Sequence, residues 1–180
     1  MSGVLLVTAA RRGIGATMAR MAGKRGFTLL ELMVVVGVIA ILALIMLPGY
    51  LDQIIRKQII DALPLADIAK APIATSWALT QTLPRDNAGI GLPSSDKVVN
   101  NFISSLAVQD GAIHITFGNN VNSSIKGKIL SIRPAVVEDA PVVPVAWVCG
   151  YAKGPDKMTI KGENKTNVSA SYLPFNCRAS

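Results

Sequence analysis

An apolar run near the N-terminus constrains this chain more than any other feature of its sequence. From Phe27 to Leu51, Glu31 is the only charged side chain. This stretch is longer than the roughly 20 residues that a helix needs to cross the hydrocarbon core of a bilayer. The sequence therefore predicts a hydrophobic transmembrane helix over residues 27–51.

Basic residues are concentrated directly before this run. Residues 1–26 contain no acidic side chain and five basic ones, which supply most of the net charge of +7: Arg11, Arg12, Arg20, Lys24 and Arg25. Such a segment is typical of the cytoplasmic flank of a membrane helix. An ordinary secretory signal is cleaved after its apolar region, whereas the only suitable site here, Gly26, lies before it. We therefore expect residues 1–26 to be a leader peptide that is removed.

The chain becomes amphipathic after the apolar run. Apolar residues recur every three or four positions, as on one face of a helix: Ile55, Ile59, Ala62, Ala66, Ala69, Ile73 and Trp77. We expect one helix from about residue 27 to 80, whose amphipathic half lies within the segment 52–82. Pro48, Pro64 and Pro72 should bend it, because proline lacks a backbone donor.

The remainder, residues 83–180, is expected to form a globular head. A loop rich in proline and glycine covers residues 83–97, and Asp110-Gly111 is a strong hairpin signal. Alternating patterns predict strands over Phe102–Gln109, Ala112–Phe117, Lys128–Arg133 and Val145–Cys149, with the third ending where prolines interrupt residues 134–144. The sequence thus predicts an α+β fold in which an antiparallel sheet of about four strands packs on the amphipathic half-helix. His114, the only histidine, is expected at the surface.

The junction Lys24-Arg25-Gly26-Phe27-Thr28-Leu29-Leu30-Glu31 has a distinctive order of residue types. It resembles the prepilin signal of type IV pilins and their pseudopilin relatives. Gly37, Pro48 and Tyr50, and the head sequence from Leu92 to Arg178, extend the resemblance over most of residues 21–180. A signal anchor with a chance carboxylate is the alternative. The resemblance implies the type IV pilin fold, cleavage between Gly26 and Phe27 by a membrane prepilin peptidase, and methylation of the new Phe27 amine.

The resemblance also implies partners and a location. The chain would be a structural subunit of a type IV pilus, held in the inner membrane before an assembly machinery polymerises it with other copies into a helical filament on a Gram-negative cell surface. The filament would serve adhesion, twitching motility or DNA uptake. A carboxylate inside a membrane helix is costly unless it is paired. Glu31 is therefore expected to pair with the Phe27 amine of a neighbouring copy; the alternative is a carboxylate that reaches back to the membrane surface.

The two cysteines, Cys149 and Cys177, both lie in the part of the chain that would be exported. Disulfides persist in oxidising compartments. We therefore expect these cysteines to pair and to close a C-terminal loop.

Four lysines within this loop recur at every fourth position: Lys153, Lys157, Lys161 and Lys165. They could form a basic patch for DNA or another anionic surface, as in a minor DNA-binding pilin used in natural transformation. Gly154, Pro155 and Gly162 disfavour a helix that would align them, so a solvated loop is the preferred interpretation. Asp156 and Glu163 supply too few oxygens for a calcium site, and no metal or cofactor is expected.

Residues 1–21 contain one pattern that suggests a different function and two methionines that suggest a later translation start. Thr8-Ala9-Ala10-Arg11-Arg12-Gly13-Ile14-Gly15 resembles the nucleotide-binding opening of short-chain dehydrogenases. Ala9 replaces its first glycine, however, and no tyrosine is followed four residues later by lysine, so we expect no enzyme. Met18 and Met21 are alternative translation starts, and we expect synthesis to begin at Met21.

Overall fold

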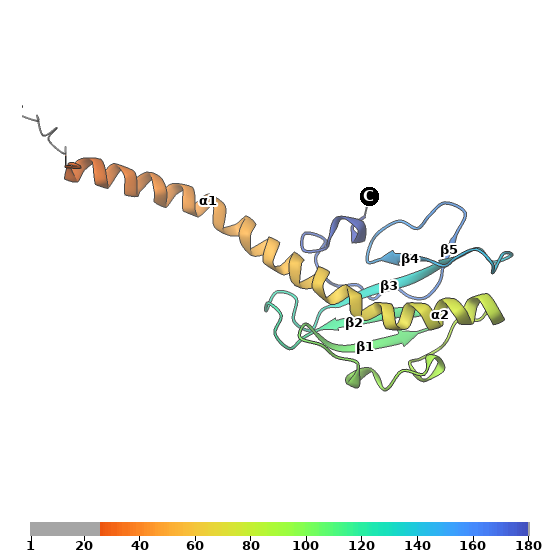
Figure 1. Ribbon diagram of the computed structural model, residues 1–180. Helices are drawn as coiled ribbons and strands as arrows, with labels where there is room; N and C mark the ends of the chain where they lie inside the picture. Colours follow the sequence, from red (N-terminus) through yellow and green to blue (C-terminus); the bar gives the residue numbers. More distant parts are fainter. Residues whose placement is uncertain (1–25, 180) are drawn as a thin grey trace, which may run out of the picture. The chain divides into compact units, whose positions relative to one another are not determined.

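The computed structural model describes residues 26–179, except for the side chains of residues 46–48. The expected leader, residues 1–26, thus lies outside the described residues apart from Gly26, and so do the alternative starts Met18 and Met21. The chain divides into two units, one ending at Ile41 and the other beginning at Leu42. Figure 1 shows the order of the helices and strands within the second unit.

The apolar run forms the first part of helix α1, Leu29–Ala62. The helix begins two residues after Phe27 because Thr28 caps it: the Thr28 hydroxyl oxygen accepts a hydrogen bond from the Glu31 backbone N–H at 3.2 Å. Its most apolar window has a mean hydropathy of 2.9 and no buried residue. By length and composition, this is the one helix within residues 26–179 that could cross a membrane.

The expected single helix over residues 27–80 is interrupted at Pro64. Helix α1 ends at Ala62, a short 3-10 segment, η1, covers Leu63–Ala66, and helix α2 covers Asp67–Thr80. Pro64 lacks the N–H that an α-helix needs at this position, which accounts for the local change of winding. Pro72 lies inside α2 and does not end it. A bend was also expected at Pro48, whose side chain is not described.

The predicted stripe of the amphipathic half is confirmed. All seven of its residues are buried, with exposed fractions of 6% or less: Ile55, Ile59, Ala62, Ala66, Ala69, Ile73 and Trp77. The first six of them, from Ile55 to Ile73, join one core cluster with residues of the sheet, among them Leu106, Ile115 and Leu130. The alanines allow the helix backbone to approach the strands closely, and the larger side chains fill the space on either side.

The sheet is antiparallel, with strand order β1-β2-β3-β4 (Figure 1). Strand β1 covers Ile103–Gln109, β2 Ala112–Phe117, β3 Ile129–Val136 and β4 Ala146–Cys149. A fifth strand, β5, covers only Thr159–Ile160 and pairs with β3. Four short 3-10 segments complete the fold, namely η1 and three in the head: η2 (Ala88–Ile90), η3 (Ser95–Lys97) and η4 (Phe175–Cys177).

Strand β3 is longer than predicted, because Pro134 does not end it. The Pro134 carbonyl accepts a hydrogen bond from the Lys161 N–H at 2.9 Å. In a strand the N–H and the carbonyl of one residue point to the same side, so the missing donor of Pro134 faces the gap between the start of β2 and the end of β5. Proline is tolerated in a sheet where no partner needs its N–H. Residues 134–136 therefore belong to β3 and not to the interrupting loop.

Gly162, two residues after the end of β5, is held tightly against the start of β2. Its φ is +79°, and a Cβ at this position would lie 2.6 Å from the Cβ of Ala112. Gly127 has a similar φ of +73°, but a Cβ there would meet nothing within 4 Å. The two glycines thus share the backbone conformation and differ only in the space around them.

We therefore predict that Gly162→Ala destabilises the head more than Gly127→Ala. Both variants place a side chain in the left-handed region, at a cost of roughly 1–2 kcal/mol. Gly162→Ala adds overpacking, typically about 1–3 kcal/mol. Denaturant unfolding of the detergent-solubilised chain, followed by tryptophan fluorescence, measures both. Equal losses of unfolding free energy would contradict the close contact with Ala112.

Candidate functional site

The segment from Gly26 to Glu31 contains the residues that the sequence singles out for processing and assembly. Gly26 is exposed and precedes the helix, and a Cβ built on it meets nothing within 4 Å. Phe27 is 76% exposed. The fold of the chain therefore places no demand for a glycine at residue 26. Any requirement for it would come from a protein that binds this segment.

Glu31 lies in the first turn of α1, where a negative charge is favoured by the helix dipole. Thr28 and Glu31 have the spacing of a capping box, Thr-x-x-Glu, and this sequence signal was missing from the sequence-based interpretation. The ion pairs among residues 26–179 do not include the Glu31 carboxylate. The carboxylate thus stands exposed among apolar side chains, and its own chain supplies no counter-charge in the described part.

The predicted disulfide between Cys149 and Cys177 is present. It joins the end of β4 to η4, and next to it the Tyr151 N–H donates to the Cys177 carbonyl at 2.9 Å. Closing a loop of this length stabilises a fold by roughly 3–4 kcal/mol in the chain-entropy treatment. The bridge therefore fastens the C-terminal segment to the edge of the sheet.

The segment closed by the disulfide is also tied to β3 by side chains. The Asn167 carbonyl oxygen accepts from the Ile129 N–H at 2.6 Å, and the Thr166 hydroxyl accepts from the Ser131 N–H at 3.0 Å. The Lys165 N–H donates to the Ser131 hydroxyl oxygen at 2.9 Å. Residues 165–167 thus cover the face of the sheet that is turned away from the helices.

His114 lies beneath this cover, so the prediction of a surface histidine was wrong. It is only 4% exposed, and its Nδ1 lies 2.9 Å from the Ser131 hydroxyl oxygen. Alternation along β2 correctly placed it on the face opposite Ile113 and Ile115, but that face is buried by the C-terminal segment. Burial, and secondarily the charge of Lys165, lower the pKa of His114 below its ordinary value.

The four loop lysines do not form one unpaired cationic patch. Lys161 forms an ion pair with Glu138, and Lys165 contacts Gln109 and lies 3.6 Å from Glu163. Lys153 and Lys157 are exposed. The segment is a loop with β5 inside it, so the four-residue spacing does not align the side chains. No group of three or more potential metal ligands occurs among the described residues.

Two families match the chain by sequence. The model of the family described as pilin (bacterial filament) matches residues 56–178, and that of the prokaryotic N-terminal methylation motif matches residues 21–47. The first covers more than half of the chain and includes the sheet, the disulfide loop and all of the helix stripe except Ile55. The chain belongs to the type IV pilin family.

Several curated pilins resemble this pilin over most of their length. A fimbrial protein of Neisseria meningitidis serogroup A is 33% identical over 164 residues, which cover 86% of this chain and 94% of the relative. The type IV major pilin protein PilE of Neisseria gonorrhoeae is 32% identical over 161 residues, with the same two shares. A fimbrial protein of Pseudomonas aeruginosa is 29% identical over 173 residues, which cover 89% of this chain and 100% of the relative.

Membership of this family identifies a structural protein and disfavours the dehydrogenase interpretation. The dehydrogenase-like residues from Thr8 to Gly15 precede both matched segments and lie outside the described residues. The α+β fold expected for a pilin, with a long N-terminal helix and an antiparallel sheet, is confirmed.

The buried His114 predicts that the head of this pilin loses stability on mild acidification. Since folding lowers the pKa of His114, the unfolded chain takes up the proton more readily, and the free energy of unfolding falls as the pH drops below about 6.5. Replacing His114, the only histidine, by Gln should flatten the dependence of the unfolding midpoint on pH between 7.5 and 5.5. If the unfolding midpoint of the unaltered chain and that of His114→Gln changed equally with pH, His114 would not be the group that causes the acid sensitivity.

Proposed function

We propose that this pilin is made as a membrane-anchored precursor and becomes a structural subunit of a type IV pilus after cleavage between Gly26 and Phe27. The observation that carries the proposal is the exposure of the apolar part of α1. Every described side chain from Phe27 to Ile45 is exposed. Burying one such leucine, isoleucine or valine is worth about 1.5–3 kcal/mol. A bilayer before assembly, and neighbouring copies afterwards, would each supply that burial.

Cleavage at this point has a direct electrostatic consequence. Hydrolysis of the Gly26–Phe27 peptide bond creates a new amine on Phe27, which is protonated near neutral pH and keeps its charge when methylated once. The charge lies at the start of the apolar run, where the only acidic group is Glu31. A carboxylate of this kind is expensive in an apolar environment unless it is paired. We infer that the Phe27 amine of one copy neutralises Glu31 of the next.

The remaining partners follow from this pathway. A prepilin peptidase in the membrane would cut and methylate the chain, and an assembly machinery would extract it from the inner membrane of a Gram-negative cell into the filament. Adhesion, twitching motility and DNA uptake are all compatible with such a filament. The pairing of Lys161 with Glu138, and of Lys165 with Glu163, gives no support to a dedicated DNA-binding patch.

Gly26→Leu should block cleavage and leave the full-length precursor in the membrane. The added side chain has open space around it in the structure, so the stability of the head should not change. Intact-mass measurement on membranes and filaments tests this. Gly37→Leu, at a second glycine with nothing within 4 Å of its Cβ, is the matched control and should be cut normally. A mature chain that begins at any residue other than Phe27 would refute the proposed site.

Glu31→Gln should leave membrane insertion intact and reduce filament yield by about tenfold or more, equivalent to a loss of ~1.4 kcal/mol or more per subunit contact. The amide has the same shape but cannot neutralise the amine of the neighbouring copy. Asp156→Asn makes the same chemical change on an exposed loop and should not alter the yield. The readout is the amount of sheared filament per cell. A Glu31→Gln yield equal to that of Asp156→Asn would remove the charge-pairing argument.

A further inference from the structure

Two apolar features of the head have no partner among the described residues of its own chain. The first is Phe175, which is 90% exposed, the highest exposure of any large apolar side chain among the described residues. It is also held firmly: Pro174 precedes it, the Cys177 N–H donates to the Pro174 carbonyl at 3.0 Å, and Cys177 is fixed by the disulfide. Because the backbone is already held, only the torsion angles of the Phe175 side chain remain to be ordered on binding.

The second feature is an open cavity of about 540 Å³ on the side of α1. Tyr50, Ile54 and Phe102 give it apolar and aromatic walls, and Lys57 and Asp61 are among its other lining residues. Its volume lies within the range of about 300–1,000 Å³ of pockets that receive whole ligands, so one aromatic side chain fits. Aromatic rings gain additional energy from offset or edge-to-face contact with other rings.

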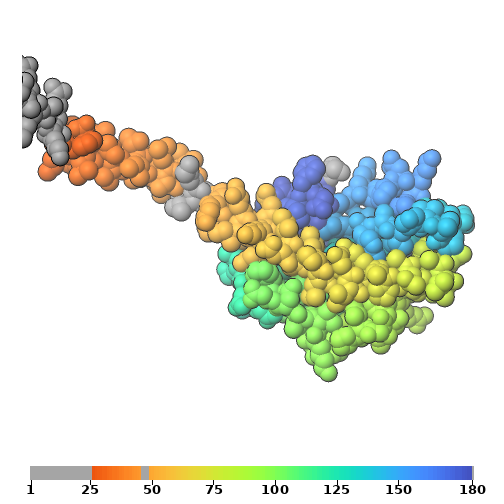
Figure 2. All heavy atoms as spheres, viewed as in Figure 1, coloured from red at the N-terminus to blue at the C-terminus, as the bar shows by residue number. Residues whose placement is uncertain are grey.

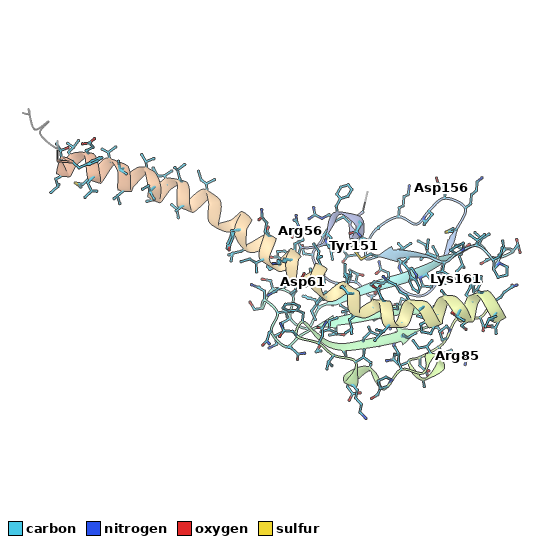
Figure 3. The ribbon with its side chains drawn as sticks, viewed as in Figure 1. Arg56, Asp61, Arg85, Tyr151, Asp156 and Lys161 are labelled. Carbon is cyan, nitrogen blue, oxygen red and sulfur yellow. A yellow bond between two sulfur atoms is a disulfide. The ribbon has the colours of Figure 1, made fainter. Side chains whose placement is uncertain are left out.

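These two features face different sides of the same helix. The helical residues that line the cavity are spaced at intervals of three or four and so share one stripe: Tyr50, Gln53, Ile54, Lys57, Gln58 and Asp61. Arg56 lies on another stripe, and its guanidinium donates to the Ser171 carbonyl at 2.9 Å in the C-terminal segment. Figure 3 shows Arg56 and Asp61 projecting from opposite sides of α1. In Figure 2 the C-terminal residues and the residues near 100 correspondingly lie on opposite sides of this helix.

A contact between an apolar projection and a cavity on different surfaces of identical chains has a defined consequence. Each copy can use its projection on one neighbour and its cavity on another, so the contact is heterologous and leaves both ends open for growth. Such a contact builds rings or, when its rotation does not close, open filaments, and not closed dimers. In sequence, Tyr50 and Ile54 come directly after the apolar residues that the filament would bury, so neighbouring copies packed along that helix bring their heads together.

We propose that Phe175 of one copy inserts into the cavity formed by Tyr50, Ile54 and Phe102 of a second copy, as a contact between heads that adds to the helix-mediated assembly. The proposal rests on the proposed function as a filament subunit. It assigns to the disulfide loop a role in assembly, because the disulfide fixes the position of the side chain that is inserted.

Two substitutions in the full chain test the contact. Phe175→Asp should reduce filament yield by about tenfold or more, since the aromatic ring that would pack on Tyr50, Ile54 and Phe102 is lost and a carboxylate would be brought against these side chains. Val142→Asp places the same charge at a residue that is 89% exposed and lines no part of this cavity, and it should retain the yield of the unaltered chain. Thermal unfolding of the detergent-solubilised proteins should be the same for both variants. Equal yields from the two variants, whether high or low, would overturn the contact.

A photochemical probe identifies the contacting residues directly. The photoreactive analogue p-benzoylphenylalanine replaces Phe175, and this chain is expressed together with the unaltered chain so that filaments still form. Irradiation should give covalent dimers whose adducts lie within residues 50–61 or at Phe102. Adducts elsewhere, or the absence of dimers from irradiated filaments, would overturn the contact while leaving the proposed function intact. If the unaltered chain formed no filaments, both the proposed function and this contact would fail.

Discussion

The packing of one helical stripe against the sheet holds the head together. From Ile55 to Trp77 the stripe crosses the 3-10 segment at Pro64 without losing its burial, and Ala62 before the segment and Ala66 at its end are both fully buried. Alanines in its middle let the backbone lie close to the strands, while isoleucines and a tryptophan fill the ends. The sheet, the cover on its far face and the disulfide all depend on this layer, since none of them has an extensive core of its own.

The same helix serves two environments because its two parts differ in composition. Its later residues alternate between buried and charged positions, whereas the residues up to Ile45 are apolar on every side and exposed wherever their side chains are described. A helix that is apolar all round requires an apolar environment that surrounds it. Membrane insertion and polymerisation are two ways of meeting this single requirement. Glu31 gives the otherwise uniform surface one position at which a charged partner is favoured.

The C-terminal segment shows how a loop with few apolar residues is kept in place. Backbone and side-chain hydrogen bonds join residues 165–167 to β3. Farther along the segment, the Ser171 carbonyl accepts a hydrogen bond from the Arg56 guanidinium of α1. The disulfide then limits the freedom of the unfolded chain. This fixation leaves Phe175 exposed and oriented, and it buries His114 and Ser131. One loop therefore determines both the exposure of Phe175 and the burial of His114.

Local order was enough to predict the apolar run, the buried stripe, the hairpin at Asp110-Gly111 and the match of residues 21–47 to the N-terminal methylation motif. Each follows from residues within a few positions of one another, through periodicity or turn chemistry. Only the tertiary structure decided the features that depend on distant segments. His114 is buried because residues some fifty positions later cover it, and β3 continues through Pro134 because its missing N–H faces the gap between β2 and β5. Two of the loop lysines are held apart by other segments, Lys161 by Glu138 and Lys165 by Gln109. The cavity beside α1 exists because Phe102, which is distant in sequence, lies against the helix. Periodicity reports which face of a segment a residue occupies, but what covers that face is settled only when the chain packs.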